Sequence, residues 1–219
     1  IIDAIPAGPD GHNVDDLLAA MAGFVAEFVE WRTTQPPYGD VIDTLLALEI
    51  DGERLPMEIV IANVVLLLAA GVETTGSVVA TSLDHLGRDP ELRRRLAAQP
   101  ELIGQACEEF LRLYASVQLQ PRTVQHDTEL GGEQLKAGDR VLLAYAAASR
   151  DPKLYVCPSE FRLDRDTKSH VAFGLGAHRC IGSNVARLEF RIALEELLRR
   201  IPEYELAPDH VYVRKIDHI

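Results

Sequence analysis

The sequence is poor in cysteine. Its 219 residues include three cysteines, Cys107, Cys157 and Cys180, and no C-x-x-C pair. An odd number of unpaired thiols argues against a disulfide framework and against a zinc ribbon. A reducing compartment fits this pattern best, so we expect a cytoplasmic protein.

The sequence also has few basic residues and no long apolar run. It carries 22 Lys and Arg against 34 Asp and Glu, a net charge of -12, which argues against general nucleic-acid binding. The longest apolar run, residues 59–72, is shorter than the ~20 residues of a membrane span, so it predicts a buried helix. The chain begins at Ile1 without a targeting pattern, and we expect an interior start. Neither nucleic acid nor a membrane is an expected partner.

A globular core is what the composition does support. Hydrophobic residues make up 47% of the chain, enough for one domain or for part of a larger one. Apolar periodicity and Gly or Pro breaks predict helices, followed in the middle of the chain by antiparallel hairpins. The helices are expected at about 14–31, 41–48, 56–86, 90–98, 101–114 and 183–200, and the hairpins at about 122–145. The predicted fold class is mainly α with a small antiparallel β component.

One cysteine stands among glycines, in FGLGAHRCIG at residues 173–182. The segment begins G-x-G, but Arg179 takes the place of the third glycine of a dinucleotide fingerprint, and no βαβ pattern surrounds it. Glycines permit close approach of the backbone, and the following helix directs its positive end at Cys180, which favours a thiolate. A single soft ligand does not make a tetrahedral zinc site, whereas haem iron needs one axial protein ligand.

This segment resembles the haem-binding signature of the cytochrome P450 family, F-x-x-G-x-[RH]-x-C-x-G. The matching residues are Phe173, Gly174, Gly176, His178, Cys180 and Gly182. The resemblance implies haem b, iron protoporphyrin IX, with Cys180 as the proximal iron ligand. It extends over nearly the whole chain but only over the carboxy-terminal half of a usual member, so it implies a cytochrome P450 fold that is incomplete on the amino-terminal side.

A second segment, AAGVETTG at residues 69–76, is similar to the oxygen-activation motif A-G-x-[DE]-T of that family. Ala70, Gly71, Glu73 and Thr74 match the motif. A threonine hydroxyl that bonds the carbonyl one turn back can widen a helix locally and leave room for dioxygen. We expect Thr74 and Glu73 to relay protons to bound oxygen. The alternative, a helix whose polar residues face a neighbouring element, remains open.

The spacing E-x-x-R, which places two charges on one helix face, occurs three times. The pairs are Glu91 with Arg94, Glu109 with Arg112, and Glu196 with Arg199. The order of motifs in the family selects the middle pair, and exposed surface pairs are expected for the other two.

The resemblance also implies a further arginine in this network and cationic partners for the haem propionates. Arg165 is the expected third member of the network, with Arg162 as the alternative. Arg122 and His178 match the propionate-binding positions. For Arg179, a propionate contact and a solvent-facing side chain both stay open.

The activity that the resemblance implies is that of a haem-thiolate monooxygenase acting on O2 and a small organic substrate. Because the chain carries no flavin or iron–sulfur motif, a ferredoxin and an NAD(P)H-dependent ferredoxin reductase are the implied electron donors. Arg187 and Arg191 lie one turn apart and suit a basic partner surface, although an ordinary solvated helix face explains them too. The alternative function is a haem-binding or scaffold fragment without turnover of its own.

Overall fold

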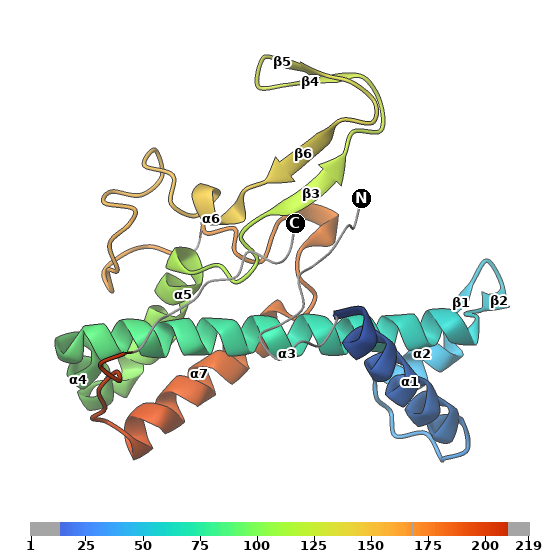
Figure 1. The fold of residues 1–219 in the computed structure, drawn as a ribbon, viewed down its shortest axis with the longest axis horizontal. Coiled ribbons are helices and arrows are strands. Elements are labelled where there is room, and N and C mark those ends of the chain that lie inside the picture. The colour runs from blue at the N-terminus through green and yellow to red at the C-terminus, as the bar shows by residue number, and fades with distance from the viewer. Residues whose placement is uncertain (1–13, 168, 210–219) are drawn as a thin grey trace. The chain divides into compact units, whose positions relative to one another are not determined.

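A computed structural model describes residues 14–167 and 169–209 of the chain. The chain divides into two compact units, one ending at Val72 and the other beginning at Glu73. Helix α3 (Met57–Arg88) runs through this boundary (Figure 1). Helices predominate and the strands are short and antiparallel, which confirms the predicted fold class.

The first unit places two helices and a hairpin ahead of α3. These elements are α1 (Val14–Thr33), α2 (Val41–Ala47), β1 (Glu49–Ile50) and β2 (Glu53–Arg54). Asp51 and Gly52 form the hairpin turn with φ of 54° and 83°, the two positive values that a type I′ turn requires. The sequence predicted a turn here but not the two short strands around it.

A buried arginine joins α1 to α2. Arg32, 2% exposed, binds Asp40 at 3.1 Å and Asp43 at 2.7 Å, and its guanidinium lies 3.9 Å from the ring centroid of Tyr38. Asp40 also caps α2 by accepting backbone N–H groups. Next to these charges is a small aliphatic core, formed by Val25, Val29, Ile42, Val60 and Val64.

The second unit contains the remaining elements. After α3 they are α4 (Pro90–Ala98), the 3-10 turn η1 (Pro100–Leu102), α5 (Ile103–Leu113), β3 (Gln120–Thr123), β4 (Thr128–Leu130), β5 (Glu133–Leu135), β6 (Arg140–Leu143), α6 (Tyr145–Ala148), the 3-10 turn η2 (Gly176–His178) and α7 (Ser183–Arg200). Pro90 opens α4 at the position where a missing N–H costs nothing, and Asp89 caps that helix through the N–H of Leu92.

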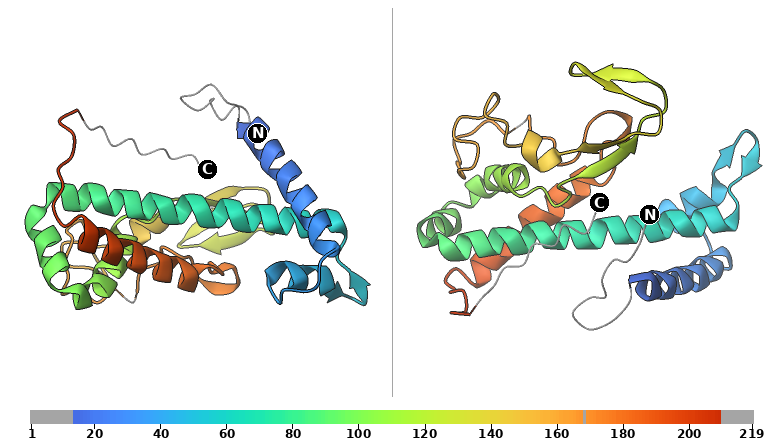
Figure 2. Two further views of the ribbon diagram at one scale, coloured as in Figure 1. Left: turned by 90° about the horizontal axis from the view of Figure 1, so that it is seen from below. Right: turned by 45° about the horizontal axis from the view of Figure 1, so that its top comes forward.

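The core of this unit lies where α4, α5 and α7 pack together (Figure 2). Phe110 of α5 is fully buried, with ring centroids 4.5 Å from Phe161 and 6.3 Å from Phe190 of α7. Burial of such aromatic side chains contributes about 2–3 kcal/mol each. The aromatic centre therefore fixes α7, the helix that follows the cysteine segment, against α5.

The described strands of the second unit form two separate antiparallel pairs. β3 pairs with β6 from Gln120 opposite Leu143 to Thr123 opposite Arg140, and β4 pairs with β5 across a turn at Gly131 and Gly132. The β4–β5 hairpin continues outward from the β3–β6 pair (Figure 1).

The expectation of a buried helix over residues 59–72 holds only for the face that carries Val60 and Val64. Leu66 is 63% exposed and Val72 is 74% exposed, because the described residues of their own unit leave these side chains uncovered. By length and composition alone α3 could cross a membrane, contrary to the expectation from the shorter apolar run. One such helix is weak evidence, since the core helix of a soluble protein passes the same test.

Candidate functional site

The segment 173–182 folds into a tight loop closed by its own backbone. The N–H of Cys180 donates to the carbonyl of Phe173 at 2.9 Å, and the N–H of Arg179 donates to Gly176 at 3.1 Å. Gly174 and Gly176 have φ of 68° and 71°, the left-handed region that side chains disfavour. These two glycines let the chain reverse twice before the cysteine.

Cys180 is exposed at the amino end of α7. Gly182 is the residue before the helix, its φ of −79° is ordinary, and the described residues leave room for a side chain there. A Cβ atom on Gly182 would lie 3.9 Å from the Cys180 sulfur. Among the described residues no side chain caps this helix end, and the positive end of the helix favours negative charge near Cys180.

The acid–alcohol segment lies on α3. Glu73 is exposed and Thr74 is half-buried, while Ala70 and Gly71 are exposed one turn earlier. The widened turn that we expected is not seen, since the helix is α-helical from Met57 to Arg88. Hydroxyl groups elsewhere in this helix show why: Thr81 and Ser82 donate to carbonyls four residues back, at 2.8 and 2.7 Å, without interrupting it.

Ser116 contacts the acid–alcohol segment on α3, and the sequence did not predict this contact. Its hydroxyl donates to the carbonyl of Thr74 at 2.8 Å from the loop after α5. This bond ties the backbone of the acid–alcohol segment to a neighbouring element of the same unit. A lone serine in a loop gives no sequence signal for such a contact.

Glu109 and Arg112 form a completely buried pair on α5. Both are 0% exposed, and their two charge-assisted hydrogen bonds measure 2.7 and 2.8 Å. Arg112 also donates to three carbonyl groups, those of Ser149, Pro158 and Glu160. The pair therefore holds α5 and the loop from 149 to 160 together.

Arg165 supplies the third side chain of this network. Its Nε lies 3.1 Å from Glu109 Oε1, whereas Arg162 contributes its backbone N–H at 3.0 Å and turns its guanidinium to Asp164. The other E-x-x-R pairs differ in kind. Arg94 pairs with Glu203 instead of Glu91, and the Glu196–Arg199 pair is exposed.

The expected propionate partners lie on two different elements. Arg122, on β3, is half-buried and donates to the carbonyl of Pro121 and weakly to Gln120 at 3.4 Å. His178 is exposed in η2. Arg179 is also exposed, and its side chain forms no hydrogen bond with the described residues, 14–167 and 169–209.

Gln120 and Tyr145 connect the β3 strand to the cysteine loop. The hydroxyl of Tyr145 donates to Gln120 Oε1 at 3.0 Å and lies 3.5 Å from where a Cβ atom of Gly174 would be. A side chain at position 174 would meet this hydroxyl. Sequence reasoning missed both residues because they belong to no motif.

Arg187 and Arg191 are ion-paired on α7. Arg187 binds Glu108 at 2.6 and 3.1 Å, and its guanidinium lies 4.5 Å from the ring centroid of Phe173. Arg191 lies 3.6 Å from Glu195. With both charges compensated, the interpretation as an ordinary helix face is favoured over a dedicated basic surface.

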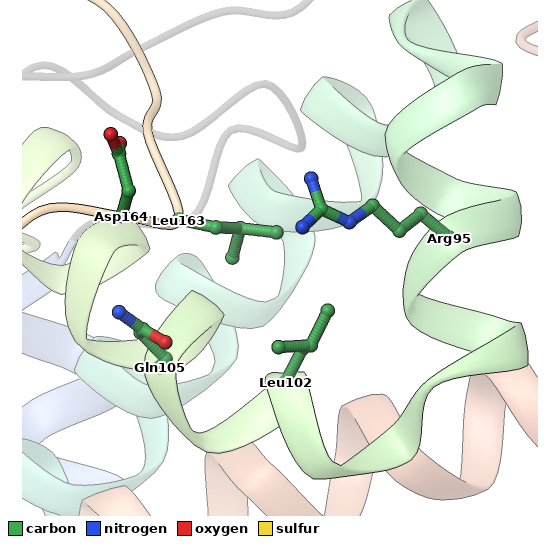
Figure 3. A pocket seen from close by; sticks show the side chains of 5 residues that line it. All are labelled: Arg95, Leu102, Gln105, Leu163 and Asp164. Atoms are coloured by element: carbon green, nitrogen blue, oxygen red, sulfur yellow. The ribbon is translucent and has the colours of Figure 1, made fainter.

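A cleft of about 270 Å³ lies elsewhere in the second unit. It is lined by Arg95, Leu102, Gln105, Leu163 and Asp164 (Figure 3). The candidate site residues contribute none of this lining. We therefore assign the cleft no part in the chemistry of the cysteine loop.

The donor set around Cys180 fits haem. In the described part of the chain, no group of three or more His, Cys, Asp or Glu side chains is arranged to hold a metal ion, so a thiolate would act here as a single protein ligand. Haem needs one such ligand and cationic or hydrogen-bonding groups for its two carboxylates, which Arg122 and His178 can provide.

Comparison with known proteins gives the family. The model of the cytochrome P450 family matches residues 6–105 and 98–217. The steroid C26-monooxygenase of Mycolicibacterium smegmatis is 34% identical over 89% of this chain and 48% of its own length. The vitamin D(3) 25-hydroxylase of Pseudonocardia autotrophica is 37% identical over 90% of this chain and 50% of its own length. The chain belongs to the cytochrome P450 family, which confirms the predicted resemblance.

Solved structures agree with this assignment. The testosterone complex of CYP109E1 from Bacillus megaterium superimposes with a TM-score of 0.80 at 34% identity, over 89% of this chain and 54% of that one. A hydroxylase of himastatin biosynthesis, HmtN, superimposes with a TM-score of 0.84 at 31% identity, over 90% of this chain and 53% of that one. The chain spans about half the length of the relatives it matches.

Proposed function

We propose that the chain is the haem-ligating part of a bacterial cytochrome P450 monooxygenase that binds haem b through Cys180. The supporting observation is an exposed thiol at the uncapped, positive end of α7, held in a loop with two left-handed glycines. When bound, haem supplies the iron at which O2 is activated. Cys180 donates negative charge to that iron, and Arg122 and His178 hold the haem carboxylates.

Proton delivery falls to α3 in this proposal. Hydroxylation consumes O2, two electrons and two protons, and yields the hydroxylated substrate and one water. Glu73 is exposed, so its carboxylate can exchange protons with solvent. Thr74, the next residue, is half-buried, and its hydroxyl would take up protons from Glu73 and pass them on to the reaction that the haem supports. Ser116 steadies the backbone of Thr74 through its 2.8 Å hydrogen bond.

The substrate and electron donors are part of the same proposal. Relatives that are named for steroid and vitamin D(3) hydroxylation support a small, apolar organic substrate. A ferredoxin, itself reduced by an NAD(P)H-dependent reductase, provides the electrons, and the protein works in the cytoplasm.

The experiment is a carbon monoxide spectrum of the reduced, haem-loaded protein that carries this chain. Thiolate ligation produces a strongly red-shifted band, which Cys180→Ala should abolish. Cys107→Ala and Cys157→Ala are the matched controls and should keep the band, since Cys107 is buried and Cys157 lies in an exposed loop away from any helix start. Survival of the band in Cys180→Ala would contradict the proposal.

One observation favours a second function, a haem-binding or scaffold protein without turnover. The chain spans only about half the length of its relatives. Consumption of NAD(P)H that depends on substrate and is coupled to product separates the two functions. A thiolate spectrum without such consumption would support the second.

A further inference from the structure

A second carboxylate on α5, Glu108, organises a cluster of its own. It lies next to Glu109 but faces different partners: Arg187 of α7 binds its two oxygens at 2.6 and 3.1 Å, and His170 Nε2 lies 3.0 Å from Oε2. The His170 side chain is 2% exposed, and those of Glu108 and Arg187 are 27% and 29% exposed. The cluster thus joins α5, α7 and the segment that leads into the cysteine loop.

The hydrogen bonds around His170 fix its orientation. The N–H of Ala172 donates to His170 Nδ1 at 3.2 Å, and Nε2 on the other side of the ring lies 3.0 Å from Glu108 Oε2. The N–H of Val171 donates to the hydroxyl of Ser149 at 3.3 Å. Glu108 therefore holds the backbone from 170 to 172 through a single imidazole ring.

The cluster reaches the cysteine through Phe173. Its ring lies under the Arg187 guanidinium, 4.5 Å from centroid to Cζ, and its carbonyl accepts the N–H of Cys180 at 2.9 Å. One carboxylate thus restrains Phe173 from two sides, through His170 along the backbone and through Arg187 across the ring. The last hydrogen bond of this path ends on the residue that carries the sulfur.

We infer that Glu108 is a positioning residue for the Cys180 thiolate, acting through His170 and Arg187 on the backbone at Phe173. This inference rests on the proposed function, in which Cys180 ligates haem iron. Neither Glu108 nor His170 belongs to the E-x-x-R or cysteine signatures, and their roles differ from that of Glu109, which binds Arg112 and Arg165. Without the Glu108 carboxylate, the cysteine loop keeps its glycines, but His170 and Arg187 lose the partner that fixes them against residues 170–173.

The test is Glu108→Gln in the haem-loaded protein that carries this chain, with Glu196→Gln as the matched control. Glutamine preserves the shape of Glu108 but not its charge. Glu196 pairs with Arg199 and Arg200 on α7, at 2.6 and 2.8 Å, and makes no hydrogen bond or ion pair to the cysteine loop within the described part of the chain. We expect Glu108→Gln to convert a measurable share of the red-shifted carbon monoxide band to the unshifted form and to move the iron midpoint potential. Glu196→Gln should change neither.

Hydrogen exchange of the amides of residues 171–180 in the haem-free protein that carries this chain gives a readout without haem. Glu108→Gln should speed this exchange severalfold, Glu196→Gln should not, and Glu108→Asp, which retains the charge, should restore part of the protection. His170→Gln and Arg187→Gln each break one link and should produce smaller changes than Glu108→Gln.

The outcomes that would contradict the positioning role of Glu108 differ from the outcome that would contradict the proposed function. An unchanged band and potential in Glu108→Gln contradict the positioning role, even where exchange becomes faster, because the cluster would then be structural only. Equal effects of Glu108→Gln and Glu196→Gln contradict it as well. If the unsubstituted protein binds haem without a thiolate band, the proposed function fails, and the inference fails with it.

Discussion

At the scale of single residues, the three cysteines differ because their surroundings differ. Burial, with smaller contributions from Glu108 and Glu195, raises the pKa of Cys107 to about 12, so this thiol stays protonated and inert inside the core. Cys157 is exposed in a loop and has a φ of 48°. Cys180 alone combines exposure with a position at the amino end of a long helix.

Replacement of Thr74 by alanine tests the proton delivery that we propose for α3. Haem content and the carbon monoxide band should stay unchanged, while hydrogen peroxide formed per NAD(P)H consumed should rise severalfold, since the hydroxyl serves protons and not ligation. Thr81→Ala is the control, because the Thr81 hydroxyl donates to its own helix at Ser77. Unchanged coupling in Thr74→Ala would count against the relay.

At the scale of elements, the buried pair on α5 predicts a large loss of stability. Arg112→Ala leaves Glu109 buried without its main partner and removes five hydrogen bonds, which should cost about 3–5 kcal/mol in the free energy of unfolding. Arg199→Ala removes an exposed pair with the same spacing and should change the free energy of unfolding far less. Urea unfolding of the two variants makes the comparison. Equal losses would show that burial does not distinguish the pairs.

Acid should weaken the Glu108 cluster. Burial disfavours the charged carboxylate, but hydrogen bonds from His170 and Arg187 outweigh burial and lower the pKa of Glu108 from 4.5 to about 2. A pKa that folding lowers adds stability above about pH 4.5, and this stability is lost as the pH falls toward 2. The unfolding free energy of the parent should therefore exceed that of Glu108→Gln by on the order of 2 kcal/mol at pH 7, and by much less at pH 3.

Denaturant unfolding at the two pH values checks this prediction. Titrating groups that do not contact Glu108 are common to parent and variant, so their contributions largely cancel in the difference. His170 contacts Glu108 and does not cancel, so the same pair of measurements is repeated in a His170→Gln background. A difference that stays constant or grows on acidification would contradict the ionised, paired state of Glu108.

Local patterns in the sequence predicted the main helices and the hairpin region, but they did not predict contacts between distant residues. The order of motifs singled out Glu109 and Arg112, the buried pair of the three with this spacing. Glu108 and His170 are 62 residues apart, and Gln120 and Tyr145 are 25 apart, so no helical or strand period relates them. Only tertiary packing brings such residues together. The exposure of much of residues 59–72 was not predicted, because a run of apolar residues indicates that a helix needs cover but not whether this chain supplies it.

At the scale of the whole molecule, apolar side chains lie exposed in both units. Leu66 and Val72 are 63% and 74% exposed in the first unit, and Leu175 and Ile181 are 71% and 89% exposed in the cysteine loop of the second. Burial of a leucine or isoleucine side chain contributes about 1.5–3 kcal/mol. Covering these exposed side chains would therefore stabilise the folded protein considerably. Relatives about twice as long have further chain with which to cover such faces.

The 219-residue chain alone should therefore bind haem weakly or not at all. One face of the macrocycle would lack its protein cover, and water would reach the bond between iron and the Cys180 sulfur, which is already exposed without haem. Titration of the purified chain with haemin, followed by absorption and by gel filtration, measures affinity and stoichiometry. The same titration of Cys180→Ala separates specific ligation from nonspecific adsorption on the exposed apolar faces. Tight binding of one haem per chain, lost in Cys180→Ala, would contradict this prediction and show that the residues of this chain suffice to hold the cofactor.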